Sequence, residues 1–412
     1  MRGRLSALML ALGAAACADT SPDAARDTSE ITTVSPPPPV QQSIANCWVF
    51  ATNAWIEALS ARPVGGTQVD LSEAYVSFLY WLDQISAPGA LEHPIFTLRA
   101  TGSWGTAADL LTRFGWMTEE EFLTTLPAGT FAERHQQAFE AVQHELTRGV
   151  LQTPAARADR KLVAETLATA WHLEPRVVAD MTKAFDDTFT RTFVTGTATH
   201  AKTRIKKLED ITVGYGTDGR PVTAQDLIGS LAEGSDAYRG ERTGPYAYSD
   251  VKPPGSEDKV RGYLRRIQRS LVQDLPVVMS ETSDDDAIDA TGTYQKPADG
   301  VLSDQWYDHA VMVFDLSVQT PHFGLLPAGV AETRPEAIAD SLTDDAVIKT
   351  FRARNSYWGR YANGAVIPFA GGVAVTDFTL DYLLWRPSYA GPRILMRTTI
   401  PNDPEMVIAK SP

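Results

Sequence analysis

The spacing of hydrophobic residues changes once along the chain, near residue 246. Before that point, stretches such as 131–148, 157–185 and 197–210 carry apolar residues at helical spacing among good helix formers, with no run typical of a strand. After it, a helix predicted over 256–274 leads into short apolar runs with β-branched residues, which are typical of strands. The pattern therefore predicts a helix-rich portion followed by a strand-rich portion.

Composition narrows the class of protein. The chain has 412 residues, of which 43% are hydrophobic and 21% charged, as in ordinary globular proteins. Its formal net charge of −14 and the lack of a basic stripe argue against nucleic acid as a partner. Two cysteines are too few for a disulfide framework, and the spacing of His135 and His144 is unlike that of a metal-binding pair. We predict neither a metal nor a cofactor, and the oligomeric state stays open.

The first 17 residues have the form of an export signal. Arg2 and Arg4 precede a short apolar stretch and then small residues that end at Cys17. The run before Cys17 resembles the lipid-attachment motif of bacterial lipoproteins, although Ala14 replaces the usual leucine. We expect lipidation of Cys17, which would anchor a lipoprotein of the bacterial cell envelope to its membrane. Ordinary signal cleavage, giving a periplasmic or secreted protein, is the alternative.

Residues 18–40 are rich in Ser, Thr, Asp and Pro and contain almost no large apolar side chains. Such a segment cannot bury a core, and the proline run at 36–39 stiffens it toward polyproline II. It is predicted to be a disordered tether that holds a folded body away from the membrane surface.

Cys47 lies at the predicted start of a helix. Apolar residues recur at spacings of three and four from Trp48 to Leu59, and Asn46 is a residue type that favours the N-cap position. In the first helical turn, unpaired N–H groups and the positive end of the helix dipole lower a thiol pKa, as a nucleophile needs. A buried structural cysteine is the alternative, because that is a common fate of a free cysteine.

The residues around Cys47 resemble the signature of the papain-like cysteine peptidases. Gln41 stands six residues before the cysteine, and the run Cys-Trp-x-Phe-Ala begins at it. In that family the glutamine amide and the cysteine N–H form the oxyanion hole, so the resemblance assigns this role to Gln41, although Gln42 lies beside it. The helix start Leu71-Ser-Glu, with Tyr75 after it, is closer to the bleomycin hydrolase-like branch, which also carries a helical insertion.

Two segments of the strand-rich portion resemble the remaining catalytic motifs. His309-Ala-Val begins a predicted strand, like the strand that carries the family's catalytic histidine, whereas a lone histidine there is normally structural. Asn355-Ser-Tyr-Trp-Gly resembles the Asn-Ser-Trp-Gly motif, in which the asparagine holds the imidazole and the tryptophan shields their hydrogen bond. The extra Tyr357 moves Trp358 one residue later and leaves the shielding role open between them. Residues 318–346 look like a loop inserted between the two motifs.

Gly102 and Ser103 stand where the family has a Gly-Gly pair whose backbone pairs with the substrate like an added strand. The resemblance therefore assigns these two residues, together with Trp358, to substrate binding. A simple turn followed by a helix cap explains Ser103 equally well.

The resemblance implies an α+β, papain-like two-lobed fold with a large helical insertion. A helical lobe at 41–118 would carry Cys47, residues 119–245 would form the insertion, and residues 246–412 would form the strand-rich lobe and a C-terminal extension. The implied activity is hydrolysis of peptide bonds in peptide or protein substrates by a Cys47 thiolate with His309 as its partner. Two alternatives stay open: a catalytically inactive binding protein on the same fold, and an acyltransferase that uses the same pair of residues.

Overall fold

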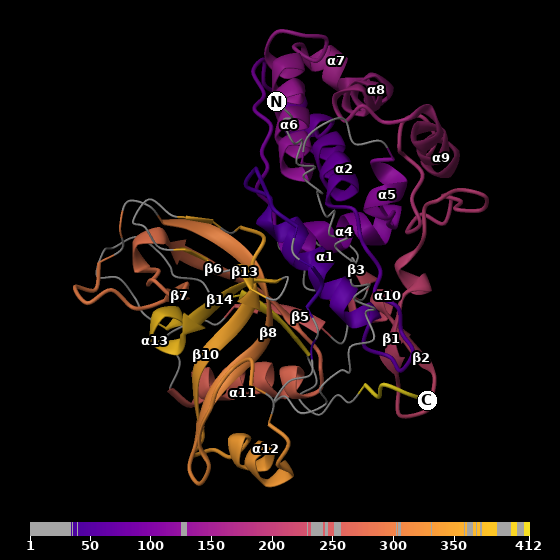
Figure 1. The fold of residues 1–412 in the computed structure, drawn as a ribbon. Coiled ribbons are helices and arrows are strands. Elements are labelled where there is room, and N and C mark those ends of the chain that lie inside the picture. The colour runs from indigo at the N-terminus through magenta and orange to yellow at the C-terminus, as the bar shows by residue number, and fades with distance from the viewer. Residues whose placement is uncertain are drawn as a thin grey trace, which may run out of the picture.

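The structure, a computed structural model, describes most of the chain beyond the predicted tether. The residues described are 34, 36–38, 40–124, 130–228, 230–231, 242–243, 246–250, 257–301, 303, 306–330, 332–357, 359–360, 366–367, 369–370, 373–384, 397–401 and 408–412. A helix-rich part from Cys47 to Ile228 is followed by a sheet-rich part from Tyr246 to Pro401, so the architecture is α+β. Figure 1 shows the helices of the helix-rich part on one side of the molecule and the large sheet, with α11 (Glu257–Val272), α12 (Pro335–Ser341) and α13 (Leu380–Leu383) next to it, on the other.

The helix-rich part is built around one fully buried helix. Every residue of α1 (Cys47–Ser60) is buried, and its polar residues Asn53 and Glu57 are bonded to the backbone of Leu71. α2 (Glu73–Ile85) is capped by the Ser72 side chain, which accepts a hydrogen bond from the Tyr75 N–H. The other helices are α3 (Pro88–Leu91), α4 (Trp104–Phe114), α5 (Glu119–Phe122), α6 (Phe131–Thr147), α7 (Pro154–Ala158), α8 (Arg160–Ala170), α9 (Pro175–Phe185), the 3-10 turn η1 (Leu208–Asp210) and α10 (Ala224–Ile228). No helix in the described ranges is long and apolar enough to cross a bilayer.

The predicted helical insertion is only partly helical. Helices confirm the periodicity of residues 131–148 and 157–185, but residues 197–210 form turns and extended backbone that end in η1. Trp116 and Lys206 exchange two backbone hydrogen bonds of 2.9 Å each. Pairing with this distant segment satisfies backbone groups that the predicted helix would have paired locally.

A β-hairpin also interrupts the insertion, where the sequence predicted no strand. β1 (Thr212–Tyr215) pairs antiparallel with β2 (Pro221–Thr223). The connection contains Asp218 and Gly219, and Gly219 has a φ of +76°. An Asp-Gly dipeptide between short strands is a known hairpin signal, which the helical interpretation overlooked. A second short pair follows, β3 (Ser230–Leu231) with β4 (Arg242–Thr243).

The sheet-rich part contains, among the described residues, a nine-stranded and mostly antiparallel sheet. Its strands follow the order β13-β14-β10-β8-β6-β15-β5, with β7 paired to β14 and β9 to β8. The long strand β8 (Trp306–Thr320) lies between β10 (Val347–Arg354) and β6 (Val277–Asp284). The other strands are β5 (Tyr246–Asp250), β7 (Thr293–Tyr294), β9 (Gly324–Leu326), β13 (Phe369–Ala370), β14 (Val373–Thr379) and β15 (Arg397–Pro401), beside the separate pair β11 (Gly359–Arg360) and β12 (Val366–Ile367).

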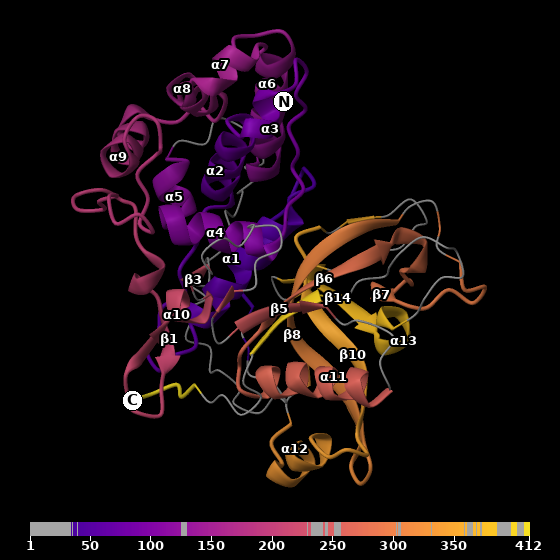
Figure 2. The same ribbon diagram turned by 180° about the vertical axis from the view of Figure 1, so that it is seen from behind.

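Short helices flank the sheet, and α11 (Glu257–Val272) confirms the helix predicted over 256–274. α11 packs against β6, β8 and β15 and lies along one side of the sheet (Figure 2). Residues 318–346, predicted to be an inserted loop, hold the end of β8, its hairpin partner β9 and the helix α12 (Pro335–Ser341). The remaining short helices are the 3-10 turn η2 (Asp285–Ala287) and α13 (Leu380–Leu383).

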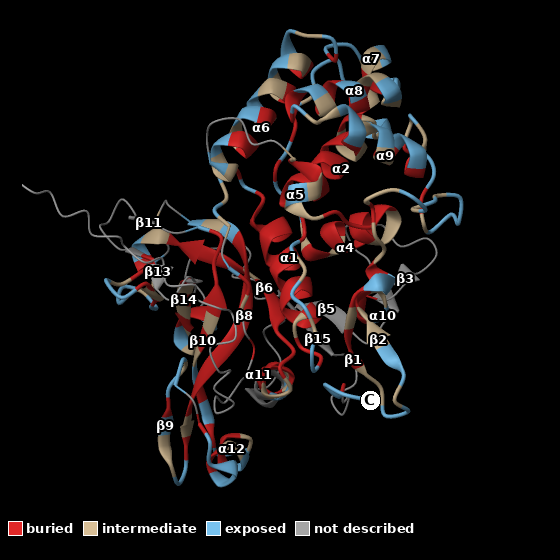
Figure 3. Cartoon of the chain, turned by 45° about the vertical axis from the view of Figure 1, so that its right-hand side comes forward, coloured by how far each residue is buried: buried red, intermediate tan, exposed pale blue. Residues whose placement is uncertain are grey.

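α1 and β8 join the two parts. The buried side chains of α1 and those of Ala310, Met312 and Phe314 belong to one hydrophobic cluster. The Trp55 Nε1–H donates across the junction to the Pro276 carbonyl at 2.8 Å. Figure 3 shows α1 and β8 almost entirely buried where they lie side by side. This packing places residues that are far apart in the sequence, Cys47 and the start of β8, next to each other.

The folded body begins inside the segment predicted to be a tether. Val34 and Pro37 are buried, and the Arg354 guanidinium donates to the carbonyls of Pro37, at 3.0 Å, and Pro38, at 2.6 Å. Burial of a guanidinium requires acceptors for its N–H groups, and these two prolines supply them. The end of the proline run is therefore held against the last residue of β10.

Candidate active site

Cys47 occupies the first position of α1, as predicted, but the expected cap is absent. Asn46, at φ −118° and ψ 28°, makes no side-chain cap hydrogen bond. Its Nδ2 lies 3.4 Å from Ser77 Oγ and 3.2 Å from His135 Nε2 instead. Tertiary partners in the helix-rich part have therefore replaced the local interaction that the residue type predicted.

The backbone around the thiol supplies three hydrogen-bond donors. The N–H groups of Cys47 and Trp48 act on the sulfur from the first turn of α1, and that of Ala310 acts on it from β8. Each of these contacts lowers the pKa of the thiol, because a donor stabilises the thiolate. The contact with Ala310 places the sulfur beside the residue that follows His309.

His309 and Asn355 are brought together by the pairing of β8 with β10. The His309 Nε2 lies 2.9 Å from Asn355 Oδ1, and both residues are almost fully buried, at 3% and 1% exposed. Asn355 is itself held by three further bonds: its N–H donates to Ala374 O at 2.9 Å, its Nδ2 to Thr376 Oγ1 at 3.1 Å, and its Oδ1 accepts from the Tyr357 N–H at 2.9 Å. The asparagine side chain therefore cannot rotate without losing several bonds.

This network determines which imidazole nitrogen carries the proton. A backbone N–H can only donate, so the atom of Asn355 that faces Tyr357 is the carbonyl oxygen. The same oxygen faces His309, so Nε2 must donate to it. The neutral ring then has an unprotonated Nδ1. Within the described residues, this Nδ1 is buried without a hydrogen-bond partner.

The electrostatics contradict the predicted lowering of the thiol pKa. Burial raises the pKa of the Cys47 thiol to about 12, because the loss of solvation outweighs the three N–H donors and the nearby Glu281 carboxyl acts in the same direction as burial. Burial likewise lowers the pKa of His309 to about 4, although its bond to Asn355 acts in the opposite direction. Loss of solvation disfavours both charged forms. The Cys47 thiol and the His309 imidazole are therefore both neutral in this structure at neutral pH.

The two candidate oxyanion glutamines differ in their surroundings. The Gln42 N–H donates to Ser356 O at 2.9 Å, and its Oε1 accepts from Ser356 Oγ at 2.6 Å. Gln42 is thus bound to the residue after Asn355. Gln41 is exposed on the extended segment before α1. The assignment of the oxyanion role to Gln41 stays a prediction.

Gly102 is held against Trp48, the residue that follows Cys47. A Cβ at Gly102 would lie 2.6 Å from the Trp48 indole, closer than atoms can pack. The Trp48 Nε1–H donates to Ala100 O at 2.8 Å, and the Tyr80 hydroxyl donates to Thr101 O. Among the described residues, none bonds to the Gly102 N–H or carbonyl. This backbone is therefore open for pairing with an extended peptide.

Ser103 has the structural role that the sequence left as an alternative. Its side chain caps α4 by accepting from the Thr106 N–H at 3.3 Å. Tyr357 supplies its backbone to Asn355, and its side chain is 40% exposed. The predicted substrate-binding residue Trp358 lies outside the described residues. The predicted lipidation site, Cys17, also lies outside them.

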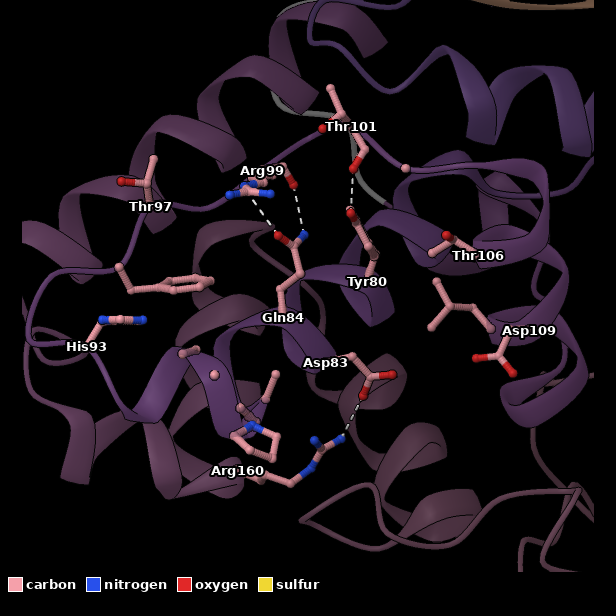
Figure 4. Close-up of a pocket in the computed structure, with 18 of the residues that line it drawn as sticks. Tyr80, Asp83, Gln84, His93, Thr97, Arg99, Thr101, Thr106, Asp109 and Arg160 are labelled. Atoms are coloured by element: carbon pink, nitrogen blue, oxygen red, sulfur yellow. Dashed lines mark hydrogen bonds and ion pairs between the residues drawn. The ribbon is translucent and has the colours of Figure 1, made fainter. Parts of the chain in front are cut away.

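A large cavity opens beside Gly102 and Ser103. It measures about 1030 Å³ and is lined by residues of α2, of α4 and of the segment 95–103, which forms neither helix nor strand (Figure 4). The Gln84 amide bonds to the backbone of Arg99 in both directions, at 2.8 and 3.2 Å. Asp83 lies deeper, where it pairs with Arg113 and, at 3.1 Å, with Arg160. Gly102 and Ser103 line this cavity, whereas Cys47 does not.

One residue of the site, Glu281 on β6, was not predicted. It pairs directly opposite His309 in the antiparallel register of β6 and β8 and is 2% exposed. In the sequence, Glu281 could have been noticed as a charged residue that follows the apolar and small residues at the start of this strand. The cross-strand partner of such a residue depends on register, which a single strand does not reveal.

Comparison with known proteins gives little further information. No protein-family model and no curated protein matches this chain. Among solved structures, PepW from Lactobacillus rhamnosis HN001 is similar with a TM-score of 0.43 and 10% sequence identity, over 91% of this chain and 82% of that one. A similarity of this size does not assign the chain to a family. In the described part of the chain, no group of three or more His, Cys, Asp or Glu side chains is placed to hold a metal ion.

Proposed function

We propose that the protein is a papain-like cysteine peptidase, nearest in style to the bleomycin hydrolase-like branch, with Cys47 as its nucleophile. One observation carries the proposal. An imidazole whose Nε2–H is bound by Asn355 has an unprotonated Nδ1, and the N–H of the next residue, Ala310, contacts the sulfur of a cysteine at the start of a helix. A nucleophile, a base and a residue that orients the base are the parts that thiol-dependent acyl transfer needs.

The reaction begins from the neutral pair. His309 Nδ1 takes the thiol proton as the sulfur attacks the carbonyl carbon of the scissile amide, which gives an imidazolium and a tetrahedral oxyanion. The Cys47 N–H and the proposed Gln41 amide stabilise that oxyanion, and one such donor typically contributes about 10²–10³ in rate. The imidazolium then protonates the amine, the C–N bond breaks and an acyl-thioester remains. Water, deprotonated by Nδ1, releases the carboxylic acid and restores the thiol.

The open backbone of Gly102 is proposed to bind the substrate as an added strand. An extended peptide paired with Gly102 would pass Trp48 and reach Cys47, because Gly102 rests on the indole of Trp48. Residues farther from the scissile bond would then enter the cavity bordered by Asp83 and Gln84. We also propose, as the sequence predicts, that export and lipidation at Cys17 place this activity at the bacterial cell envelope.

The raised pKa of the thiol supports a second candidate, a catalytically inactive binding protein on the same fold. A thiol with a pKa of about 12 is not ionised at neutral pH, and the structure as it stands holds no imidazolium to stabilise a thiolate. The two candidates differ in whether opening the site to a peptide lowers the thiol pKa. Thiol alkylation rates measured against pH, with and without bound peptide, distinguish them.

The decisive experiment compares the full-length protein with its Cys47→Ala variant on a peptide library. We expect cleavage by the wild type and none by Cys47→Ala at equal concentration, with the same melting temperature for both proteins. Peptide binding by both without cleavage by either supports the binding protein. Product that forms only when an amine is added supports the acyltransferase. Equal cleavage by both proteins contradicts Cys47 as the nucleophile.

A further inference from the structure

Glu281 is a buried carboxyl group with one oxygen that lacks a partner. Its Oε1 accepts a hydrogen bond from Ser283 Oγ at 2.6 Å. Its Oε2 is buried and, among the described residues, has no hydrogen-bond partner. A buried oxygen of this kind is costly to leave unsatisfied, so it needs an explanation.

The strand register places Glu281 directly opposite the proposed catalytic histidine. Residues that lie directly opposite each other in an antiparallel ladder share one face of the sheet, with Cβ atoms about 4.5–5.5 Å apart. Glu281 is opposite His309, and Ser283 is opposite Tyr307. The carboxyl group also acts electrostatically on the Cys47 sulfur, which lies against β8. Two unsatisfied buried atoms, Glu281 Oε2 and His309 Nδ1, therefore belong to neighbouring residues at one site.

The protein charges around this carboxyl are negative. The groups that act most strongly on Glu281, apart from Ser283, are Asp308 on β8 and Asp285 in η2, and both raise its pKa. Tyr307 donates its hydroxyl to Asp285 at 3.0 Å on the same face. No cation contributes to these interactions in the described part of the chain. What the group lacks is a positively charged hydrogen-bond donor.

We propose that Glu281 is a specificity-determining residue that binds a cationic amine of the substrate next to the scissile bond. This inference rests on the proposed peptidase function and adds to it a substrate class, peptides with a positive charge near the cleavage point. Burial raises the pKa of Glu281 to about 8, so the free carboxyl is largely protonated at neutral pH. A bound ammonium group would donate to Oε2 and stabilise the ionised form. It would also offset the repulsion between Glu281 and a thiolate at Cys47, so that a cationic substrate favours both binding and attack.

Two kinds of amine fit this chemistry, a lysine side chain and the α-ammonium group of a peptide N-terminus. The test uses one fluorescent peptide series in which a residue on either side of the scissile bond is lysine or norleucine. Each peptide is made with a free and with an acetylated N-terminus. Binding is measured by fluorescence anisotropy on the Cys47→Ala variant, and cleavage is measured with Cys47 present.

We expect the Cys47→Ala protein to bind one cationic form about ten-fold or more tightly than its neutral match, as a charge-assisted bond in a buried site would give. Adding Glu281→Gln should reduce that ratio to less than about two-fold. Asp286→Asn, which removes one negative charge from an exposed position nearby, should leave the ratio unchanged. A preference that survives acetylation identifies lysine, and a preference lost on acetylation identifies the N-terminus.

Two results would overturn the inference: equal binding of all cationic and neutral forms, or a cation preference that persists in Glu281→Gln. If Glu281→Gln does not fold, Glu281→Met provides a second neutral variant. The ratio of affinities for cationic and neutral peptides, measured with Glu281 present, still tests whether the site prefers a cation. Failure of the peptidase proposal looks different. In that case no peptide is cleaved, whereas the binding preference on the Cys47→Ala variant remains measurable.

Discussion

The helix-rich and sheet-rich parts each bury a histidine almost completely, yet the two histidines have different neighbours. His135 has its Nε2 3.0 Å from Ser77 Oγ, and its ring packs against Trp171 with centroids 4.8 Å apart. His309 has its Nε2 on Asn355. Burial lowers the pKa of His135 to about 3 and that of His309 to about 4. In both rings, within the described residues, Nδ1 is buried without a partner.

Burial, pKa and an unsatisfied nitrogen therefore do not distinguish the proposed catalytic histidine from a structural one. The neighbours do. The His135 ring lies among aromatic side chains, including Phe131 and Trp81, which can neither give nor take a proton. The His309 ring belongs to the residue before Ala310, whose N–H contacts the Cys47 sulfur.

The largest expected effect comes from changing the two histidines in the same way. His309→Gln keeps an amide donor for Asn355 but cannot accept a proton, so kcat/KM should fall by about 10²- to 10⁴-fold with little change in stability. His135→Gln should lower kcat/KM by less than about ten-fold and the free energy of unfolding by about 1–3 kcal/mol, since it disturbs buried polar contacts. Peptide cleavage and urea unfolding measure these quantities. Equal losses of activity in the two variants would contradict the distinction drawn between them.

The next effect is the pH dependence of stability, to which both parts contribute. Burial raises the pKa of Glu119 in the helix-rich part and of Glu281 in the sheet-rich part to about 8 each. Each folded-state carboxyl then holds its proton more tightly than the unfolded chain does. The stability it contributes is complete below about pH 4.5 and is lost as the pH rises toward 8, at up to about 1.4 kcal/mol per pH unit for each group.

The two buried histidines reduce the stability of the fold at acidic pH. Their pKa values are lowered, so their contribution is present above about pH 6.5 and is lost as the pH falls toward 4. Urea unfolding from pH 4 to pH 8 should therefore show a maximum in the mildly acidic range. Glu119→Gln and Glu281→Gln should each flatten the alkaline side, independently of each other, because the two sites lie in different parts. An alkaline side unchanged in both variants would contradict the burial of these groups.

The smallest expected effect concerns the segment beside the nucleophile. Gly102→Ala would push a methyl group into Trp48, so the segment must shift, at a cost of about 1–3 kcal/mol in the free energy of unfolding. We expect KM for peptides to rise several-fold, because the open backbone moves with it. Gly89→Ala is a matched control on the rim of the same cavity, where a Cβ meets nothing within 4 Å. Kinetics and thermal melting measure both variants, and an equal change in the two would remove Gly102 from the substrate path.

Features that depend on residues close together in sequence were largely predictable. The helix that starts at Cys47, the cap at Ser72 and the helix that becomes α11 follow from spacing and residue type over one or two turns. The predictions that were wrong, such as the helix at 197–210 and the cap at Asn46, failed where a distant segment offered the backbone or side chain a better partner.

By itself the sequence determined the candidate nucleophile, the order of Cys47, His309 and Asn355, and the change from helices to strands. The proton's place on the imidazole, the raised pKa of the thiol and the presence of Glu281 were decided only by the tertiary structure. The physical reason is that these properties depend on burial and on strand register. Both arise from contacts between residues that the chain brings together only when it folds.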